Sequence, residues 1–206
     1  MGARLLFLPW TRFVRIVSLA LLCSACATQT QRLVPIDQEE QSARRQALLA
    51  LDVWQVHGRI AVRAGNEGWS AGFDWQQADK DYRIQLRGPF GQGALELKGG
   101  ARGVWLTRAG QPAVFATDPE ILLQQQSGWS LPVTGLAHWL RGVPDNKGNA
   151  ISQRDVAGRL ISLQQRGWQI DYAEYQRYGV YDLPTRLVLQ RDKLRVKVLI
   201  DRWELP

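Results

Sequence analysis

The stretch Tyr82–Leu97, Tyr-Arg-Ile-Gln-Leu-Arg-Gly-Pro-Phe-Gly-Gln-Gly-Ala-Leu-Glu-Leu, predicts a β-hairpin. Apolar and polar residues alternate on both sides of its centre, as expected for strands with one face toward a core and the other toward water. The four residues Gly88–Gly91 between the two halves have the composition of a turn. This stretch therefore predicts two antiparallel strands of a half-buried sheet.

The turn carries an aromatic residue, Phe90, although turn tips lie in water and are usually polar. Pro89 and the flanking glycines leave the ring without a local partner. Two interpretations remain open: the ring folds back onto the sheet, or it is an exposed probe for a membrane or ligand. The hairpin alone favours the first interpretation, but the rest of the chain favours the second, an exposed probe.

The first 25 residues of the 206 have the pattern of a secretory signal. Three arginines precede a short apolar run, Ile16–Leu22, which is too short for the roughly 20 residues that a membrane-spanning helix needs. The following Ser24-Ala25-Cys26 resembles the bacterial lipobox, in which the cysteine becomes the acylated N-terminus. The alternative is an ordinary secreted protein with a Cys23–Cys26 disulfide. By the same resemblance, Ala27 as the second mature residue implies sorting to the outer membrane.

The remaining chain divides into a polar tether, residues 26–37, and a single domain, residues 38–206. The net charge of +7 falls to +4 without the three signal arginines, since 23 basic and 19 acidic residues remain. The sequence has no Lys/Arg-rich run, so it does not indicate nucleic-acid binding. Weak attraction to anionic lipid head groups stays open.

Periodicity predicts a helix over Gln38–Leu51 and then a meander of strands. Two further helices follow. Thr117 or Asp118 caps the first, which has Pro119 in its first turn, and the second begins at Pro132 or Val133. Beyond the hairpin, the predicted strands are Trp54–Val62, Trp69–Trp75, Val104–Leu106, Ala113–Phe115, Arg159–Gln165, Trp168–Tyr175, Arg186–Arg191 and Lys193–Trp203.

About six strands, two helices and about four strands thus follow the N-terminal helix. A sheet this long curls, and the two apolar central helices are well placed to cover its concave face. The expected fold is mainly β: a curved antiparallel sheet or unclosed β-barrel with an N-terminal helix and a two-helix lid over an apolar cavity. The alternative is an ordinary sheet-and-helix core without a cavity.

The shared alternation assigns twelve residues to the lining of that cavity. A one-residue slip in any strand would move its residues to the other face. The candidates are Trp54, Ile60, Phe73, Trp75, Ile84, Leu86, Leu95, Trp168 and Leu187 on the sheet and Leu122, Leu136 and Trp139 on the helices.

The sequence gives little indication of catalysis. His57 and His138 are its only histidines, and neither lies in a cluster with ligand spacing. The sequence has no nucleophile elbow, zinc spacing or phosphate-binding loop, so no enzyme activity, metal or cofactor is expected.

In their order along the chain, these features resemble the LolB family of lipoprotein receptors of Gram-negative bacteria. The resemblance rests on the lipobox, the two-helix insert and the segments Trp54–Gly58, Phe73–Gln77, Gly88–Gly91, Leu95–Leu97 and Ile200–Trp203. It implies an unclosed barrel with a helical lid, a lipid anchor in the outer membrane facing the periplasm, and a monomer. It also implies acceptance of acylated lipoproteins from the periplasmic carrier LolA and their insertion into outer-membrane lipid.

The family pattern places an exposed apolar residue in the loop that matches Gly88–Gly91. The resemblance therefore gives Phe90, with Pro89 and Gly91, a role in membrane insertion. Two other classes remain open: a lipid-anchored scaffold protein whose sheet only packs a core, and a carrier of other lipids.

We predict that Cys26 carries the lipid anchor, because the signal pattern ends at Ser24-Ala25. Mass spectrometry of the mature protein should find an acylated chain that starts at residue 26. An unmodified chain starting elsewhere would refute this prediction. Because the anchor serves only as a tether, a Cys26→Ala protein exported by another signal should keep part of its activity.

Overall fold

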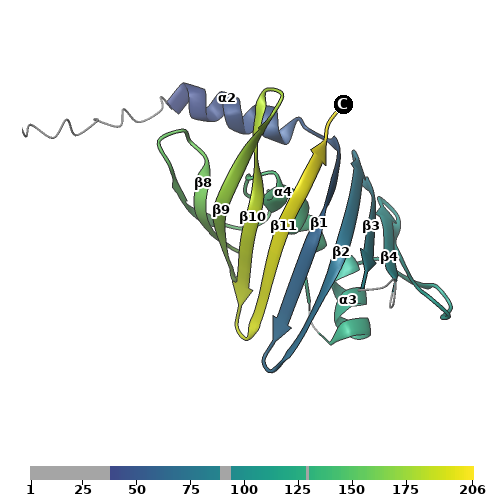
Figure 1. The fold of residues 1–206 in the computed structure, drawn as a ribbon. Coiled ribbons are helices and arrows are strands. Elements are labelled where there is room, and N and C mark those ends of the chain that lie inside the picture. The colour runs from purple at the N-terminus through teal and green to yellow at the C-terminus, as the bar shows by residue number, and fades with distance from the viewer. Residues whose placement is uncertain (1–37, 89–93, 129) are drawn as a thin grey trace, which may run out of the picture. The chain divides into compact units, whose positions relative to one another are not determined.

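The computed structural model describes residues 38–88, 94–128 and 130–206, and residues 35–206 form one compact unit. Within the described residues, eleven strands form one antiparallel sheet, accompanied by three helices (Figure 1). The helices are α2 (Gln38–Leu49), α3 (Pro119–Ser127) and α4 (Val133–Leu140). The strands are β1 (Val53–Ala64), β2 (Glu67–Ala78), β3 (Asp81–Arg87), β4 (Leu95–Gly100), β5 (Gly103–Arg108), β6 (Val114–Ala116), β7 (Ala150–Arg154), β8 (Leu160–Gln165), β9 (Trp168–Tyr178), β10 (Tyr181–Arg191) and β11 (Leu194–Glu204).

The sheet is an open meander. Its order is β6-β5-β4-β3-β2-β1-β11-β10-β9-β8-β7, so in the described part of the chain it ends at β6 and β7 and does not close into a barrel. Among the described strands, the only neighbours distant in sequence are β1 and β11, which join the two halves from Gln55↔Glu204 to Ala64↔Leu194. The expected unclosed antiparallel sheet is confirmed.

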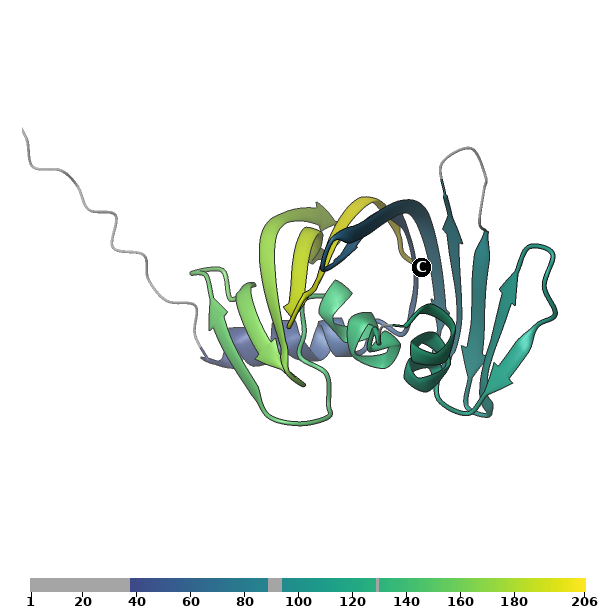
Figure 2. The same cartoon turned by 90° about the horizontal axis from the view of Figure 1, so that it is seen from below.

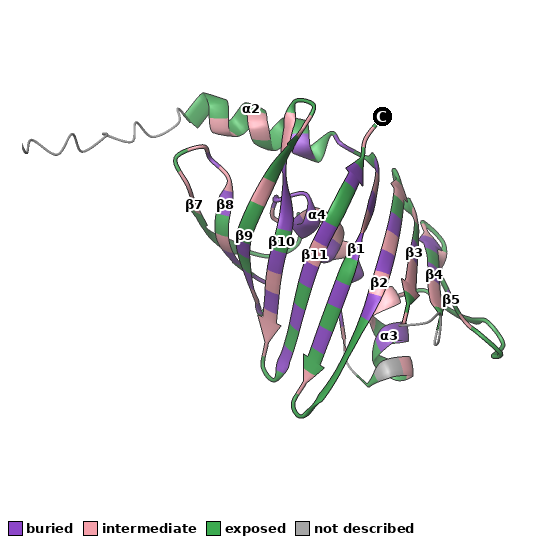
Figure 3. Ribbon diagram, in the orientation of Figure 1, coloured by how far each residue is buried: buried purple, intermediate pink, exposed green. Residues whose placement is uncertain are grey.

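Burial alternates along the strands (Figure 3), so one face of the sheet holds the core and the other is exposed. In β1, Trp54, Val56, Ile60 and Val62 are buried, whereas Arg59 and Arg63 are exposed. The inner residues of β9, β10 and β11 alternate in the same way. The predicted strand faces are therefore correct.

Gly58 allows β1 to bend in the middle of the sheet. The register between β1 and β11 shifts between His57 and Gly58, as in a β-bulge, which bends a strand and strengthens its twist. A Cβ atom at this position would lie 2.2 Å from the carbonyl oxygen of Leu199 and 2.8 Å from the Phe73 ring. Only a glycine fits here, because the neighbouring backbone and the Phe73 ring occupy that space.

Helices α3 and α4 lie within the arch of the sheet, so they cover its concave face (Figure 2). Asp118 caps α3 by accepting hydrogen bonds from the backbone N–H groups of Glu120 and Ile121, and Gly128 ends the helix in the left-handed conformation. In α4, Val133, Leu136, Trp139 and Leu140 are buried. The expected two-helix lid is therefore present.

Helix α2 is held mainly by polar contacts. Among its residues, only Leu48 is buried. Arg141, directly after α4, is itself buried and donates hydrogen bonds to the carbonyl oxygens of Leu48, at the end of α2, and of Leu51, two residues beyond it. In the middle of α2, Arg44 forms an ion pair with Asp182 (3.1 Å). The positive charge of Arg141 stabilises the C-terminal end of α2. Its hydrogen bonds also link α2 to the lid.

Two expected boundaries were wrong, and one strand was not predicted. Helix α2 ends at Leu49, two residues early, and Ala43 and Ala47, which share one side of the helix with Leu48 by spacing, are exposed. Strand β7 was missed because four of its five residues are exposed, which leaves no alternation to detect. Strand β10 begins at Tyr181 and contains Pro184, beside a register shift that accommodates the missing N–H donor.

We predict that Gly58→Ala lowers the free energy of unfolding by about 1–3 kcal/mol, the usual cost of overpacking. Chemical denaturation followed by tryptophan fluorescence measures the change. Gly72→Ala is the matched control: Gly72 pairs with Arg59 next to Gly58, and an added Cβ would meet no atom closer than 3.8 Å. Equal effects of the two substitutions would contradict a special role for Gly58.

Candidate functional site

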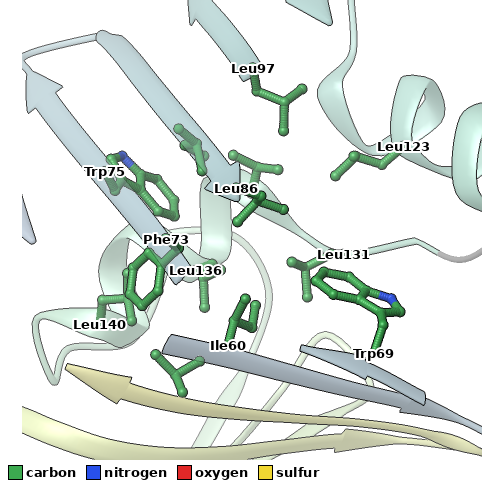
Figure 4. Close-up of a pocket in the computed structure, with 13 residues that line it drawn as sticks. Ile60, Trp69, Phe73, Trp75, Leu86, Leu97, Leu123, Leu131, Leu136 and Leu140 are labelled. Carbon is green, nitrogen blue, oxygen red and sulfur yellow. The ribbon is translucent and has the colours of Figure 1, made fainter. Parts of the chain in front are cut away.

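An apolar cavity lies between the concave face of the sheet and the lid (Figure 4). All its lining side chains are aliphatic or aromatic. They come from β1–β4, from β11, and from α3, α4 and the segment between these helices. The lining residues are Ile60, Trp69, Phe73, Trp75, Ile84, Leu86, Leu97, Leu123, Leu131, Val133, Leu136, Leu140 and Val198. Such a lining suits a hydrocarbon ligand, because it offers no charge and few hydrogen-bonding groups.

The cavity is small in this structure, at about 40 Å³. For comparison, a cavity of about 150 Å³ in a protein core holds one benzene molecule. A long hydrocarbon chain is much larger than benzene, so it would fit only if the lid moved away from the sheet. We call the arrangement of the lid in this structure closed.

Trp69 marks the outer limit of the cavity. It lines the cavity but remains 38% exposed, whereas Phe73 and Trp75 on the same strand are 6% and 2% exposed. Leu131, between α3 and α4, lies beside Trp69 in Figure 4. The cavity is therefore closest to solvent between β2 and the α3–α4 connection.

An ion-pair cluster around Arg166 connects both lid helices to the sheet. Arg166 lies in the β8–β9 turn, and its guanidinium contacts both carboxylate oxygens of Glu120 in α3 at 2.9 Å. The same guanidinium contacts Asp145 Oδ2 (3.2 Å), just after α4, and Thr134 Oγ1 (3.4 Å) within α4. Both contacts to Glu120 come from Nη2, while Nη1 reaches Asp145 and Thr134, so each terminal nitrogen of Arg166 holds a different part of the lid. We call these four residues the Arg166 cluster.

Buried hydrogen bonds hold α4 at a second place. The indole N–H of Trp139 donates to Gln165 Oε1 (3.0 Å), and the Tyr172 hydroxyl donates to the Trp139 carbonyl oxygen (3.1 Å). Burial lowers the pKa of His138, so its ring is neutral at pH 7 and makes a hydrogen bond with the Thr134 carbonyl oxygen. The lid is thus attached at defined polar points around an apolar interior.

All twelve predicted cavity residues lie on the inner side of the fold, but only half of them line the cavity. Ile60, Phe73, Trp75, Ile84, Leu86 and Leu136 line it. Trp54, Leu122, Trp139, Trp168 and Leu187 are buried elsewhere in the core, and Leu95 is half-buried against the core.

The prediction missed seven of the lining residues. The alternation itself pointed to Trp69, Leu97 and Val198, since each lies on the inner face of its strand. Leu123 and Leu140 belong to helices already predicted to be apolar. Leu131 and Val133 lie where the chain enters α4, a position for which periodicity gives no face.

Several predicted features lie outside the described residues. These are Cys26, the tether and the turn residues Pro89, Phe90 and Gly91. In the described ranges, we find no helix long and apolar enough to cross a membrane. The same part of the chain contains no group of three or more acidic, histidine or cysteine side chains arranged to hold a metal ion.

Comparison with known proteins gives a consistent family match. The model of the family described as "Outer membrane lipoprotein LolB" matches residues 52–203. "Outer-membrane lipoprotein LolB" from Pseudomonas syringae pv. syringae is 39% identical over 198 residues, covering 94% of this chain and 96% of its relative. The protein of the same name from Nitrosococcus oceani is 35% identical over 200 residues, covering 96% and 100%.

A solved structure supports the fold alone. The crystal structure of a DUF1329 family protein from Desulfovibrio piger aligns with a TM-score of 0.53 at 7% sequence identity. The alignment covers 81% of this chain and 90% of that chain.

We predict that Glu120→Gln makes the closed lid open more readily. The substitution keeps the size of the side chain but removes its charge, at a cost to the closed state of about 1.5–3 kcal/mol for a charged hydrogen bond. Stopped-flow binding of a fluorescent fatty acid should therefore become at least severalfold faster. Asp74→Asn, which weakens the convex-face ion pair with Arg87 (2.7 Å), is the control and should leave the rate unchanged.

Proposed function

Because this chain belongs to the LolB family of outer-membrane lipoproteins, we propose that it is a lipid-anchored receptor for acylated lipoproteins. In this proposal it accepts them from a soluble periplasmic carrier of the LolA type and inserts them into the inner leaflet of the outer membrane. The observation that carries the proposal is the wholly apolar lining of a cavity beneath a two-helix lid.

The energetics of acyl chains require such a cavity. Each CH₂ group removed from water contributes about 0.8 kcal/mol, so releasing several long chains into water would cost tens of kcal/mol. Transfer must therefore proceed from one apolar site to another and then into the bilayer. Its direction follows from relative affinities, because a ligand shifts an equilibrium only through differences in binding free energy.

Lid opening is the step that the closed cavity requires. The lid side chains Leu123, Leu136 and Leu140 line the cavity and lose their contacts when the lid moves. Acyl chains entering the cavity would replace those contacts, which offsets the cost of opening. The Arg166 cluster then sets how easily the empty receptor opens.

Two features outside the described residues complete the proposal. The lipid on Cys26 would keep the domain at the outer membrane. Phe90, between Pro89 and Gly91, would enter the bilayer interface during release of the cargo. A fully buried Phe side chain contributes roughly 1.5–3 kcal/mol, too little to anchor the protein but enough to orient it.

We predict that photocrosslinkers on the inner face label the acyl chains of a bound lipoprotein. Phe73 and Leu86, paired neighbours that both line the cavity, are the test positions. Asp74 and Arg87, which lie next to them in sequence and face outward, are the controls. Equal labelling at both sets would refute the assignment of the binding face.

Crosslinkers at Trp168 and Leu187 test how far the open cavity extends. Both residues are buried at 1% or less exposure, and neither lines the closed cavity. Labelling at these positions would show that opening extends the binding site along the second half of the sheet. Labelling confined to Phe73 and Leu86 would limit the site to the first half.

We predict that Phe90→Glu still accepts a lipoprotein from the carrier but fails to insert it into membranes. A carboxylate at this position would resist entry into the bilayer interface, whereas Phe90→Leu, which stays apolar, should be near normal. The opposing interpretation, a ring folded onto the sheet, predicts a lower melting temperature and equal loss of both steps. Thermal stability, acceptance and insertion are measured on each variant.

A further inference from the structure

An aromatic and basic surface lies on the convex side of the sheet, away from the cavity. Five exposed residues on five neighbouring strands are aligned by the strand register: Gln76↔Arg83, Arg83↔Lys98, Lys98↔Trp105 and Trp105↔Phe115. They form one row across β2–β6 and share a groove with Arg102. We call Arg83, Lys98, Arg102, Trp105 and Phe115 the outer patch.

The two aromatic side chains of the outer patch are largely unprotected from water. Trp105 is 50% exposed and Phe115 is 46% exposed, with their ring centroids 5.0 Å apart. Elsewhere in the described chain, Trp54, Trp75, Trp139, Trp168 and Trp203 are 4% exposed or less. Two adjacent exposed rings form an apolar surface that gains free energy when it is covered.

The charge around these rings is mainly positive. The groove contains Arg83, Lys98 and Arg102 against a single carboxylate, Asp81. Arg83 forms an ion pair with Glu96 (2.6 Å), whereas Lys98 and Arg102 form no salt bridge with any residue that the structure describes. The outer patch therefore favours an anionic partner.

Glycines shape the floor of this groove. Gly100 and Gly103 are paired across β4 and β5, and the Phe115 ring lies so close to Gly103 that an added Cβ would meet it at 2.6 Å. Gly103 has φ of +134°, in the region that favours glycine. The absence of a side chain at Gly103 therefore lets the Phe115 ring lie close against the strand.

We propose that the outer patch is a docking surface for the anionic phospholipid bilayer. Tryptophan is enriched where a protein meets the head-group region, because its ring is apolar and its N–H is polar. Basic side chains beside it are attracted to anionic head groups. The inference rests on the proposed function only in placing the domain at a membrane.

The outer patch lies on one flank of the sheet. Arg83 and Lys98 pair at the end of β3 and β4 that is remote from the turn containing Phe90, so the outer patch is a separate surface from that turn. Docking through the outer patch would hold this flank against lipid while the cavity remains on the opposite face of the sheet. It would thus contribute to orientation rather than to cargo binding.

The test measures partitioning of residues 35–206, which form a compact unit, onto lipid vesicles by flotation. The vesicles contain either phosphatidylcholine alone or phosphatidylcholine with phosphatidylglycerol. Lys98→Glu should reduce partitioning onto the anionic vesicles by about fivefold or more, since each basic residue near the surface contributes about 1 kcal/mol. The double variant Trp105→Thr, Phe115→Thr should reduce binding to both vesicle types.

Matched controls lie on the exposed surface elsewhere in the sheet. Lys197→Glu makes the same charge change in the exposed face of β11, and Ile151→Thr removes an exposed apolar side chain from β7. Both should retain wild-type partitioning. Equal losses in controls and outer-patch variants would overturn the inference.

Two further measurements separate this inference from other roles of the outer patch. If the rings only stabilise the short edge strand β6, the double variant lowers the melting temperature and leaves vesicle binding unchanged, which overturns the inference. If the outer patch binds the carrier protein, its variants lose cargo acceptance at unchanged vesicle binding, which also overturns it. Reduced vesicle binding with normal cargo acceptance supports it. A wild-type domain that never accepts cargo would instead contradict the proposed function.

Discussion

The concave face of the sheet is apolar along most of its length, and this surface must be covered. Helices α3 and α4 cover it in the closed state, and each fully buried Leu or Phe side chain beneath them contributes about 1.5–3 kcal/mol. The bulge at Gly58 helps to curve the sheet around these helices. Because the same residues pack the lid and line the cavity, the core is also the candidate binding site. In the proposed function, the stability of the empty receptor and its affinity for acyl chains would therefore depend on one set of contacts.

The polar contacts of the lid have a different role from its apolar ones. Arg166 holds Glu120 and Asp145 on either side of α4, and Arg141 attaches the end of α4 to the end of α2. These contacts fix where the lid sits, and acyl chains entering the cavity would not replace them. In the proposed mechanism the apolar contacts are exchanged for cargo, while the Arg166 cluster sets the cost of opening. Arg141 also connects α2 to the lid, and among the residues of α2 only Leu48 is buried.

The sequence predicted the sheet more completely than the site. Two-residue alternation identifies the inner face of a strand, so residues such as Phe73 and Trp75 were placed correctly. The same signal marks every inner residue, and it cannot distinguish Ile84, which lines the cavity, from Trp168, which packs elsewhere in the core. The Arg166–Glu120 pair joins residues 46 positions apart and leaves no periodic pattern. Strand β7 escaped detection because a short exposed edge strand buries no face.

Transfer of cargo between two purified proteins tests the central claim most directly. A soluble carrier loaded with an acylated lipoprotein is mixed with the purified domain, without membranes or nucleotide, and the two proteins are separated. If the lidded cavity binds acyl chains more tightly than the carrier does, most of the lipoprotein will be recovered on the domain. Lipoprotein that remains on the carrier at a large excess of folded domain would contradict the account.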